Sequence, residues 1–185
     1  MTRRGPSSPD LILAAARREF SAHGLAGART DAIARRAGVN KQLLHYYFKT
    51  KISLYHATLE RAAAELATDL GRLQLVGLTA VERLRRLIRG QFDLLADREE
   101  VTRLLVRSDG DGTWVATAVM PVARLLTEGQ ATGFFRDDVD PLLHARQALL
   151  LHLGYFALLP VTSTWGPRAA WRDRVTELLV KGCTW

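Results

Sequence analysis

Cysteine is almost absent from this chain. Its 185 residues include one cysteine, Cys183, close to the end of the sequence. One cysteine can form neither a disulfide within the chain nor a cluster of metal-binding thiolates. The Arg-rich start of the sequence is followed by PSSPD and a charged segment, so the apolar stretch of a signal peptide is missing. These features predict a protein of the reducing cytoplasm.

Catalytic and metal-binding motifs are also lacking. The five histidines are scattered, and only His56 and Glu60 combine ligand chemistry with a spacing of one helical turn. Two ligands do not make a zinc site, which takes three or four from the protein. Neither a nucleophile motif nor a Gly-rich phosphate loop accompanies any histidine. We therefore predict that the chain is not an enzyme and that it holds no metal and no cofactor.

Formal charge is missing from residues 147–167, and this length raises the question of a membrane span. Polar residues, glycine and proline interrupt the apolar run, among them His152, Gly154 and Pro160. We therefore interpret the segment as a helix that ends near Pro160 and is buried in the protein or in an interface. No membrane partner is predicted.

No segment shows the alternating pattern of a strand, whereas helical periodicity recurs along the whole chain. Gly24 and Gly38 are predicted to end the first two helices. Polar residues that can cap the later helices are Asn40, Thr50, Thr79, Thr113 and Asp140. The pattern predicts an all-α fold of about nine helices, with a turn at residues 108–112.

The formal net charge of +7 lies entirely in the first quarter of the chain. Residues 1–51 contain ten lysines and arginines against three acidic residues, whereas the rest of the chain contains sixteen of each. A basic module joined to a neutral body is typical of a nucleic-acid contact surface fused to a region with another role. Charge alone fits a solvated basic face equally well, so the interpretation depends on the motif within this segment.

Residues 30–51, TDAIARRAGVNKQLLHYYFKTK, read as two short helices joined by a tight turn. Ala34 is small enough for the two helices to approach closely, and Gly38, four residues later, tolerates the positive φ of a turn. The positions that would hold the helices together are apolar, namely Ile33, Ala37, Val39 and Leu44. This combination predicts a helix-turn-helix, whose second helix enters the major groove of DNA.

The segment from Ile12 to Leu54 resembles the tetracycline-repressor (TetR) family of bacterial transcriptional regulators. The matching residues are Ile12, Ala15, Ala16, Phe20, Gly24, Thr30, Ile33, Ala34, Ala37, Gly38, Val39, Leu44, Tyr47, Phe48, Lys51 and Leu54. The resemblance implies a three-helix DNA-binding domain over residues 1–51 and a helical effector-binding and dimerisation domain over residues 52–185. It also implies a homodimer formed through the last two long helices.

The resemblance further implies which residues contact the phosphates of double-stranded DNA. Thr30 and Lys51 would each bind a phosphate at a helix N-terminus, a position that favours anions. Tyr46 and Tyr47 would touch the backbone as well. Tyr47 and Phe48 have an alternative role as core residues that hold the second helix of the motif in place.

Contacts with base edges are implied for Asn40, Lys41 and Gln42 at the start of the second helix. Glutamine can pair bidentately with adenine, and lysine can pair with guanine. Position 42 is often glycine in the family, so Gln42 adds a base-reading side chain and the operator of a relative cannot be borrowed. His45 followed by Tyr46 reverses a common order, so His45 either contacts DNA or packs within the motif.

Apolar residues in the middle of the chain could line a pocket for a small apolar or aromatic effector. The predicted lining residues are Ile88, Phe92, Leu95, Trp114 and Met120. An ordinary core is the alternative reading of the same residues.

The segment at residues 148–159 is apolar on most sides, so its helix must be buried on most sides. A symmetric dimer interface shared with the last helix would bury it, and a monomer core is the alternative. The sequence as a whole predicts a homodimeric repressor that binds a palindromic operator and is released by a small molecule. An effector-independent regulator, an activator, and a helical binding module or enzyme with an incidental basic segment stay open.

Overall fold

The computed structural model describes residues 7–108 and 112–185, in which every regular element is helical. The N-terminal module comprises α1 (Ser8–Gly27), α2 (Thr30–Ala37) and α3 (Lys41–Phe48). The body comprises α4 (Lys51–Gly71), α5 (Ala80–Asp97), α6 (Glu99–Val106), α7 (Thr113–Ala131), α8 (Pro141–Ala157), α9 (Leu159–Thr162) and α10 (Arg168–Cys183), with a 3-10 turn at Ser163–Trp165. The predicted all-α class is confirmed. Apart from the single-turn α9, the α-helices of the described residues match the predicted number.

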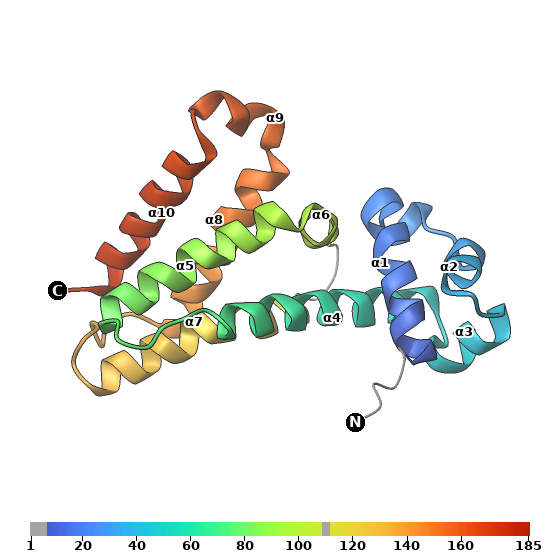
Figure 1. Ribbon diagram of the computed structural model, residues 1–185, viewed down its shortest axis with the longest axis horizontal. Helices are drawn as coiled ribbons and strands as arrows, with labels where there is room; N and C mark the ends of the chain where they lie inside the picture. Colours follow the sequence, from blue (N-terminus) through green and yellow to red (C-terminus); the bar gives the residue numbers. More distant parts are fainter. Residues whose placement is uncertain (1–6, 109–111) are drawn as a thin grey trace.

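The module lies at one end of the molecule, and α4 runs from it into the body (Figure 1). Helix α4 packs against α1 near its start and against α7 along its length. Helix α6 also packs against α1, so two helices connect the module to the body. Helix α8 packs against α7, and α10 packs against α5.

Local sequence sets several helix boundaries as predicted. The side chains of Asn40 and Asp140 each accept a hydrogen bond from the backbone N–H three residues later, at 2.7 Å and 2.8 Å. Thr50 and Thr79 each form a reciprocal capping box with the side chain three residues on. These caps satisfy N–H groups that have no partner within the first turn of a helix.

Gly38 ends α2 with φ 68°, as predicted. Gly24, with φ 66° and non-helical backbone angles, breaks α1 at the predicted place, and a short helical segment continues α1 to Gly27. The predicted cap at Thr113 is wrong, because Thr113 is the first residue of α7 and Gly112 precedes it. The predicted turn at residues 108–112 lies partly outside the described residues.

One apolar core extends from the module into the body. It includes Ile12, Phe20 and Leu44 of the module and Tyr55 and Leu59 of α4, all 2% exposed or less. The rings of Phe20 and Tyr55 meet edge to face with centroids 4.9 Å apart. The domain boundary predicted after residue 51 therefore falls in the first turn of a helix that both regions share.

Helix α8 covers most of the uncharged segment and ends at Ala157, shortly before the end predicted near Pro160. Among the described residues, no helix combines the length and the apolarity needed to cross a bilayer.

Candidate nucleic-acid interface

The turn between α2 and α3 is closed by backbone hydrogen bonds. The N–H of Gly38 donates to the carbonyl of Arg35 at 3.2 Å, and the N–H of Val39 donates to the carbonyl of Ala34 at 3.1 Å. Ala34 is buried, as close packing of the two helices requires. The αL conformation of Gly38 satisfies the last carbonyls of α2 and reverses the chain toward α3.

Helix α3 has one buried face and one exposed face. Leu44 is fully buried, and Phe48 is half-buried against the core. The exposed side chains are Lys41, Gln42, His45, Tyr46 and Tyr47. Tyr47 is 41% exposed, so of the two candidates for a core role only Phe48 takes it. The structure thus brings most of the predicted DNA-binding residues together on one surface, and their contacts with DNA stay predictions.

Neighbouring side chains restrain this exposed face. Lys41 pairs with Asp31 of α2, with Nζ and Oδ1 2.9 Å apart, and this hydrogen bond lowers the pKa of the Asp31 carboxyl below its usual value. The rings of Tyr46 and Tyr47 meet edge to face at 5.2 Å, and the Lys49 ammonium lies 5.4 Å from the Tyr46 ring centroid. Such contacts restrict these long side chains before DNA binds. The side chains therefore lose less conformational entropy on binding.

Lys51 has a role that its sequence position did not indicate. It is half-buried, and its Nζ donates to the backbone carbonyls of Ala26 and Ala28, both at 3.1 Å. These carbonyls lie where α1 ends, a place that favours a cation. The phosphate contact of Lys51 stays a prediction. In that contact the ammonium would donate hydrogen bonds to the two carbonyls and to the phosphate.

Thr30 is the first residue of α2 and is half-buried. The N–H of the preceding Arg29 donates to Oε1 of Glu19, 3.2 Å away, and Glu19 is itself 5% exposed. A carboxylate at the N-terminus of α2 stabilises the helix dipole and fixes the start of the motif. Sequence reasoning missed Glu19, because nothing in its spacing connects a residue of α1 with the start of α2.

The cations of the module differ in how exposed they are to a ligand. Arg17 is half-buried and pairs with Glu65 of α4 and Glu100 of α6, so it connects helices. Six cations of the described part of residues 1–51 are exposed, and these are Arg18, Arg29, Arg35, Arg36, Lys41 and Lys49. In that part of the chain, only Lys41 among the six forms an ion pair. Unpaired exposed cations are what a phosphate backbone attracts.

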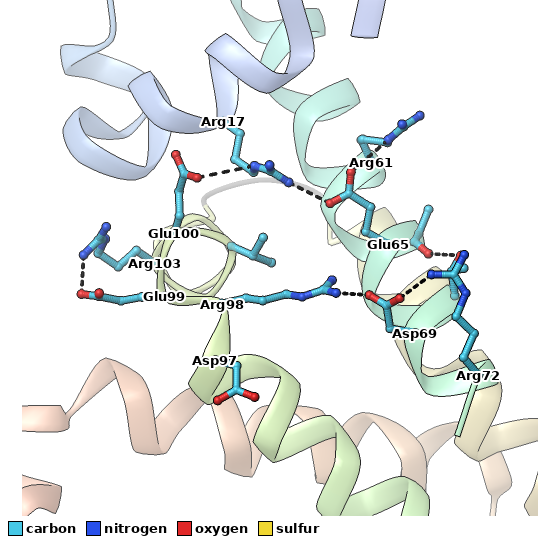
Figure 2. A pocket seen from close by; sticks show the side chains of 13 residues that line it. Arg17, Arg61, Glu65, Asp69, Arg72, Asp97, Arg98, Glu99, Glu100 and Arg103 are labelled. Carbon is cyan, nitrogen blue, oxygen red and sulfur yellow. Dashed lines mark hydrogen bonds and ion pairs between the residues drawn. The ribbon is translucent and has the colours of Figure 1, made fainter. Parts of the chain in front are cut away.

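Ion pairs cross a hollow of about 960 Å³ between α1, α4 and α6 (Figure 2). Arg17 Nη1 lies 2.7 Å from Glu65 Oε2, and Arg61 Nε lies 3.1 Å from Glu65 Oε1. Further into the body, Arg98 of the α5–α6 junction pairs with Asp69 of α4. Arginines and acidic residues are equal in number around this hollow, so it has no net charge to attract an ion.

Arg107, which follows α6, joins the body to α1. Its Nη1 donates to the carbonyls of Ser21 and Ala22 at 3.1 Å and 3.0 Å. Its own carbonyl accepts a hydrogen bond from the Tyr55 hydroxyl at 3.3 Å. The two α1 carbonyls come just before Gly24, where the backbone departs from helical geometry.

The effector pocket predicted from five residues stays a prediction, and the structure places these residues in different surroundings. Ile88 and Phe92 are fully buried, and Trp114 is 5% exposed. Met120 is exposed and lines a hollow at the surface of α7. Leu95 lines a different cavity, of about 460 Å³, between α5, α6 and the chain from α8 to α10.

A buried polar pair lies beside Phe92. His152 Nδ1 is 3.1 Å from Oε1 of Gln91, and both side chains are fully buried. Burial lowers the pKa of His152 to about 3, so the ring is neutral at physiological pH. The described residues contain no cluster of three or more potential metal ligands.

Comparison with known proteins agrees with this geometry. The family model described as "Bacterial regulatory proteins, tetR family" matches residues 12–58. The chain is 28% identical over 158 residues to the HTH-type transcriptional repressor NicS of Pseudomonas putida, covering 80% of this chain and 74% of NicS. It is 32% identical over 98 residues to the HTH-type transcriptional activator FasR of Mycolicibacterium smegmatis, covering 53% of this chain and 45% of FasR.

The fold is also that of solved regulators. The transcriptional regulator FadR of Bacillus subtilis, solved in complex with stearoyl-CoA, superimposes with a TM-score of 0.76 at 20% identity, covering 93% of this chain and 97% of FadR. These relatives are regulators of transcription and not enzymes. Residues 12–58 match the helix-turn-helix model of the TetR family of bacterial transcriptional regulators, and the fold is that of solved regulators along nearly all of the chain, so the chain is similar to members of that family.

Proposed function

We propose that the protein is a homodimeric repressor that binds a palindromic operator through α2 and α3 and is released by a small molecule. The observation that carries the DNA-binding part is the exposed face of α3. Lys41 and Gln42 are exposed there, while Leu44 anchors the helix from its opposite side. Side chains so placed can reach base edges when the helix enters a major groove.

Asn40, Lys41 and Gln42 are the proposed base-reading residues. Thr30, His45, Tyr46, Tyr47 and Lys51 are the proposed backbone contacts. The exposed cations of the module supply the charge that draws it to the duplex, and backbone contacts then fix the register. In this arrangement Lys41 exchanges its ion pair with Asp31 for a contact with DNA.

Exposed leucines support a dimer through α8 and α10. Leu143 and Leu150 of α8 and Leu158, which directly follows this helix, are each more than half exposed and recur at helical spacing. Leu178 of α10 is 66% exposed. An apolar stripe of this kind is typical of a surface that a partner covers, and a second copy gives a twofold interface. Two recognition helices would then read the two halves of a palindrome.

A small-molecule effector is supported by the cavity at Leu95 and by the relationship to FadR, which was solved with stearoyl-CoA. Release would follow if the ligand preferred the conformation with the lower operator affinity. The activator alternative is favoured by the relationship to FasR, because that relative activates transcription. A reporter gene placed behind the selected operator distinguishes a repressor from an activator. A repressor lowers the expression of the reporter gene.

Selection of bound fragments from a random duplex library, at low and at moderate salt, tests the proposal. We expect one palindrome to be enriched and to survive the added salt, because base contacts add to the charge-dependent term. Loss of all binding in moderate salt without an enriched sequence would contradict sequence-specific regulation.

The dimer is tested by replacing a leucine of the exposed stripe. Leu150→Glu should dissociate the dimer in analytical ultracentrifugation and weaken operator binding, because a charge in an apolar interface is costly. Val76→Glu is the matched control, because Val76 is 92% exposed in the α4–α5 connection, away from the stripe. A monomeric wild-type protein that binds the whole palindrome would overturn the dimer.

A further inference from the structure

The cavity at Leu95 combines an apolar floor with a cationic rim. It lies between α5 and α6 on one side and the chain from α8 to the start of α10 on the other. Its apolar lining residues are Leu95, Val106, Phe156, Ala157 and Leu159. Its charged lining residues are Glu99, Arg103, Arg107 and Arg168.

The charges of the rim do not cancel. Arg103 and Glu99 neutralise each other, with Nη1 and Oε1 2.5 Å apart. Arg168 is exposed at the start of α10 and has no ion pair within the described part of the chain. Among the described residues, the Arg107 guanidinium donates only to the neutral carbonyls of Ser21 and Ala22. The cavity is therefore lined by two arginines that have no acidic partner in the described part of the chain, together with apolar residues.

We propose that this cavity binds an apolar carboxylate, with the hydrophobic part against Phe156 and Leu159 and the carboxylate against Arg168 and Arg107. A volume of about 460 Å³ lies in the range of small-molecule sites. Guanidinium groups bind carboxylates in a bidentate geometry that selects for the anion. The larger hollow between α1, α4 and α6 lacks this selectivity, because its charges are balanced.

Arg107 gives such a ligand a direct connection to the DNA-binding module, an inference that rests on the proposed function. Arg107 lines the cavity, and its guanidinium holds the two carbonyls of α1. A carboxylate is a stronger acceptor than a backbone carbonyl, so it competes for the Arg107 donors. Ligand binding would thereby weaken the contact between α6 and α1, and operator binding would reciprocally weaken ligand binding.

Calorimetric titration of the full chain with decanoate and 1-naphthoate tests the site. Each acid has its primary amide as a neutral control of nearly the same shape. We expect each acid to bind at least about tenfold more tightly than its amide, as one charge-assisted contact provides. Absence of saturable binding by both acids, or equal affinity for acid and amide, would overturn the proposal.

Variants assign the preference to the rim. Arg168→Gln should remove most of the preference for the acid, whereas Arg174→Gln, on the exposed surface of the same helix and outside the cavity, should keep it. Arg107→Gln provides a second test at the other arginine without an acidic partner among the described residues. A preference that persists in both Arg168→Gln and Arg107→Gln would overturn the assignment.

The effect of the ligand on DNA binding is measured as the Kd for the operator with and without saturating decanoate. We expect at least about a fivefold weakening in the wild type and less than twofold in Arg107→Gln. Selection of an operator by the ligand-free protein is independent of this cavity, so failure of that selection would count against the proposed function alone. An operator that is bound equally with and without bound decanoate would overturn the connection through Arg107.

Discussion

Arginines have different roles in the two regions of this molecule. In the module, Arg18, Arg35 and Arg36 are exposed and form no ion pair within the part of the chain that the structure describes. In the body, Arg85 of α5 reaches Glu177 of α10 with two hydrogen bonds, of 2.6 Å and 3.0 Å. Arg172 of α10 reaches Asp93 of α5 at 2.9 Å.

This difference shows that net charge and charge placement carry separate information. The body has as many acidic as basic residues, and ion pairs between its helices bring several of these opposite charges together. The module has an excess of cations, and most of the exposed ones form no ion pair with another described residue. An unpaired cation keeps its attraction for phosphates, whereas a paired one contributes modestly to holding two helices in register.

The largest expected effect separates the two faces of α3. Leu44→Ala should lower the free energy of unfolding by about 2–5 kcal/mol, because it removes a fully buried side chain and leaves a cavity. Chemical denaturation measures the change. A loss below about 1 kcal/mol would mean that Leu44 does not anchor the helix as its burial indicates.

The exposed face should respond in the opposite way. Gln42→Ala should leave the free energy of unfolding within about 0.5 kcal/mol of wild type, because the side chain is exposed. It should reduce discrimination at one base pair by about 1–3 kcal/mol in competition binding against single-base variants of the operator. An equal loss of affinity for all sequences would instead assign Gln42 to the backbone.

Acid should destabilise the body through His152. Its pKa is about 3 in the folded protein and about 6.5 when unfolded, so below pH 6.5 the unfolded chain binds a proton that the folded protein does not. The contribution to stability is present above pH 6.5 and is lost as the pH falls toward 3. We expect a loss of up to about 2 kcal/mol between pH 6.5 and 5.

Variants identify the source of this pH dependence. His152→Asn should flatten the profile measured by denaturation at each pH, and a remaining slope of the same sign should come from His144, whose pKa burial also lowers. His23→Asn, at an exposed position of the module, should leave the profile unchanged. A wild-type profile that is flat over this range would show that His152 is protonated without cost.

Lys51 lies at the junction of the two regions. Its replacement distinguishes its contact with the α1 carbonyls from the proposed contact with a DNA phosphate. Lys51→Met should cost about 1 kcal/mol of stability, because two carbonyls lose a charged donor. If Lys51 contacts a phosphate as proposed, the salt dependence of operator binding should decrease by about one unit of slope. An unchanged slope would show that the ammonium binds only the two carbonyls.

The smallest effect should come from an ion pair of the body. Arg85→Gln should lower the free energy of unfolding by less than about 1 kcal/mol, and the difference should shrink in high salt, because the pair with Glu177 is partly exposed. Arg86→Gln is the neighbouring exposed control. A salt-independent decrease of several kcal/mol in the free energy of unfolding would show that the pair is shielded from solvent.

Features that depend on neighbouring residues in the sequence could be predicted. The caps at Asn40, Thr50, Thr79 and Asp140 and the turn at Gly38 follow from side chains that act within one turn of their helix. The exposed face of α3 followed from the same local pattern. Thr113 was misassigned because the fold begins α7 one residue earlier than a side-chain cap would require.

Contacts between distant segments could not be predicted. Glu19 meets the start of α2, and Arg107 meets the carbonyls of α1, only because the packing of whole helices brings them together. Whether the residues predicted for the effector pocket share one cavity depends on the same packing. Apolar residues such as Ile88 and Phe92 have the composition of a pocket lining, but their burial in a packed core depends on which helices surround them.

The end of α1 is held by two cations from outside the module, Lys51 and Arg107. This arrangement limits how regulators of this kind can be recombined. A chimera that joins residues 1–50 to the body of another regulator would lose both donors unless the new body supplies a lysine and an arginine at the matching places. Exchange of operator specificity is therefore better attempted by replacing the exposed residues of α3 than by transplanting the whole module.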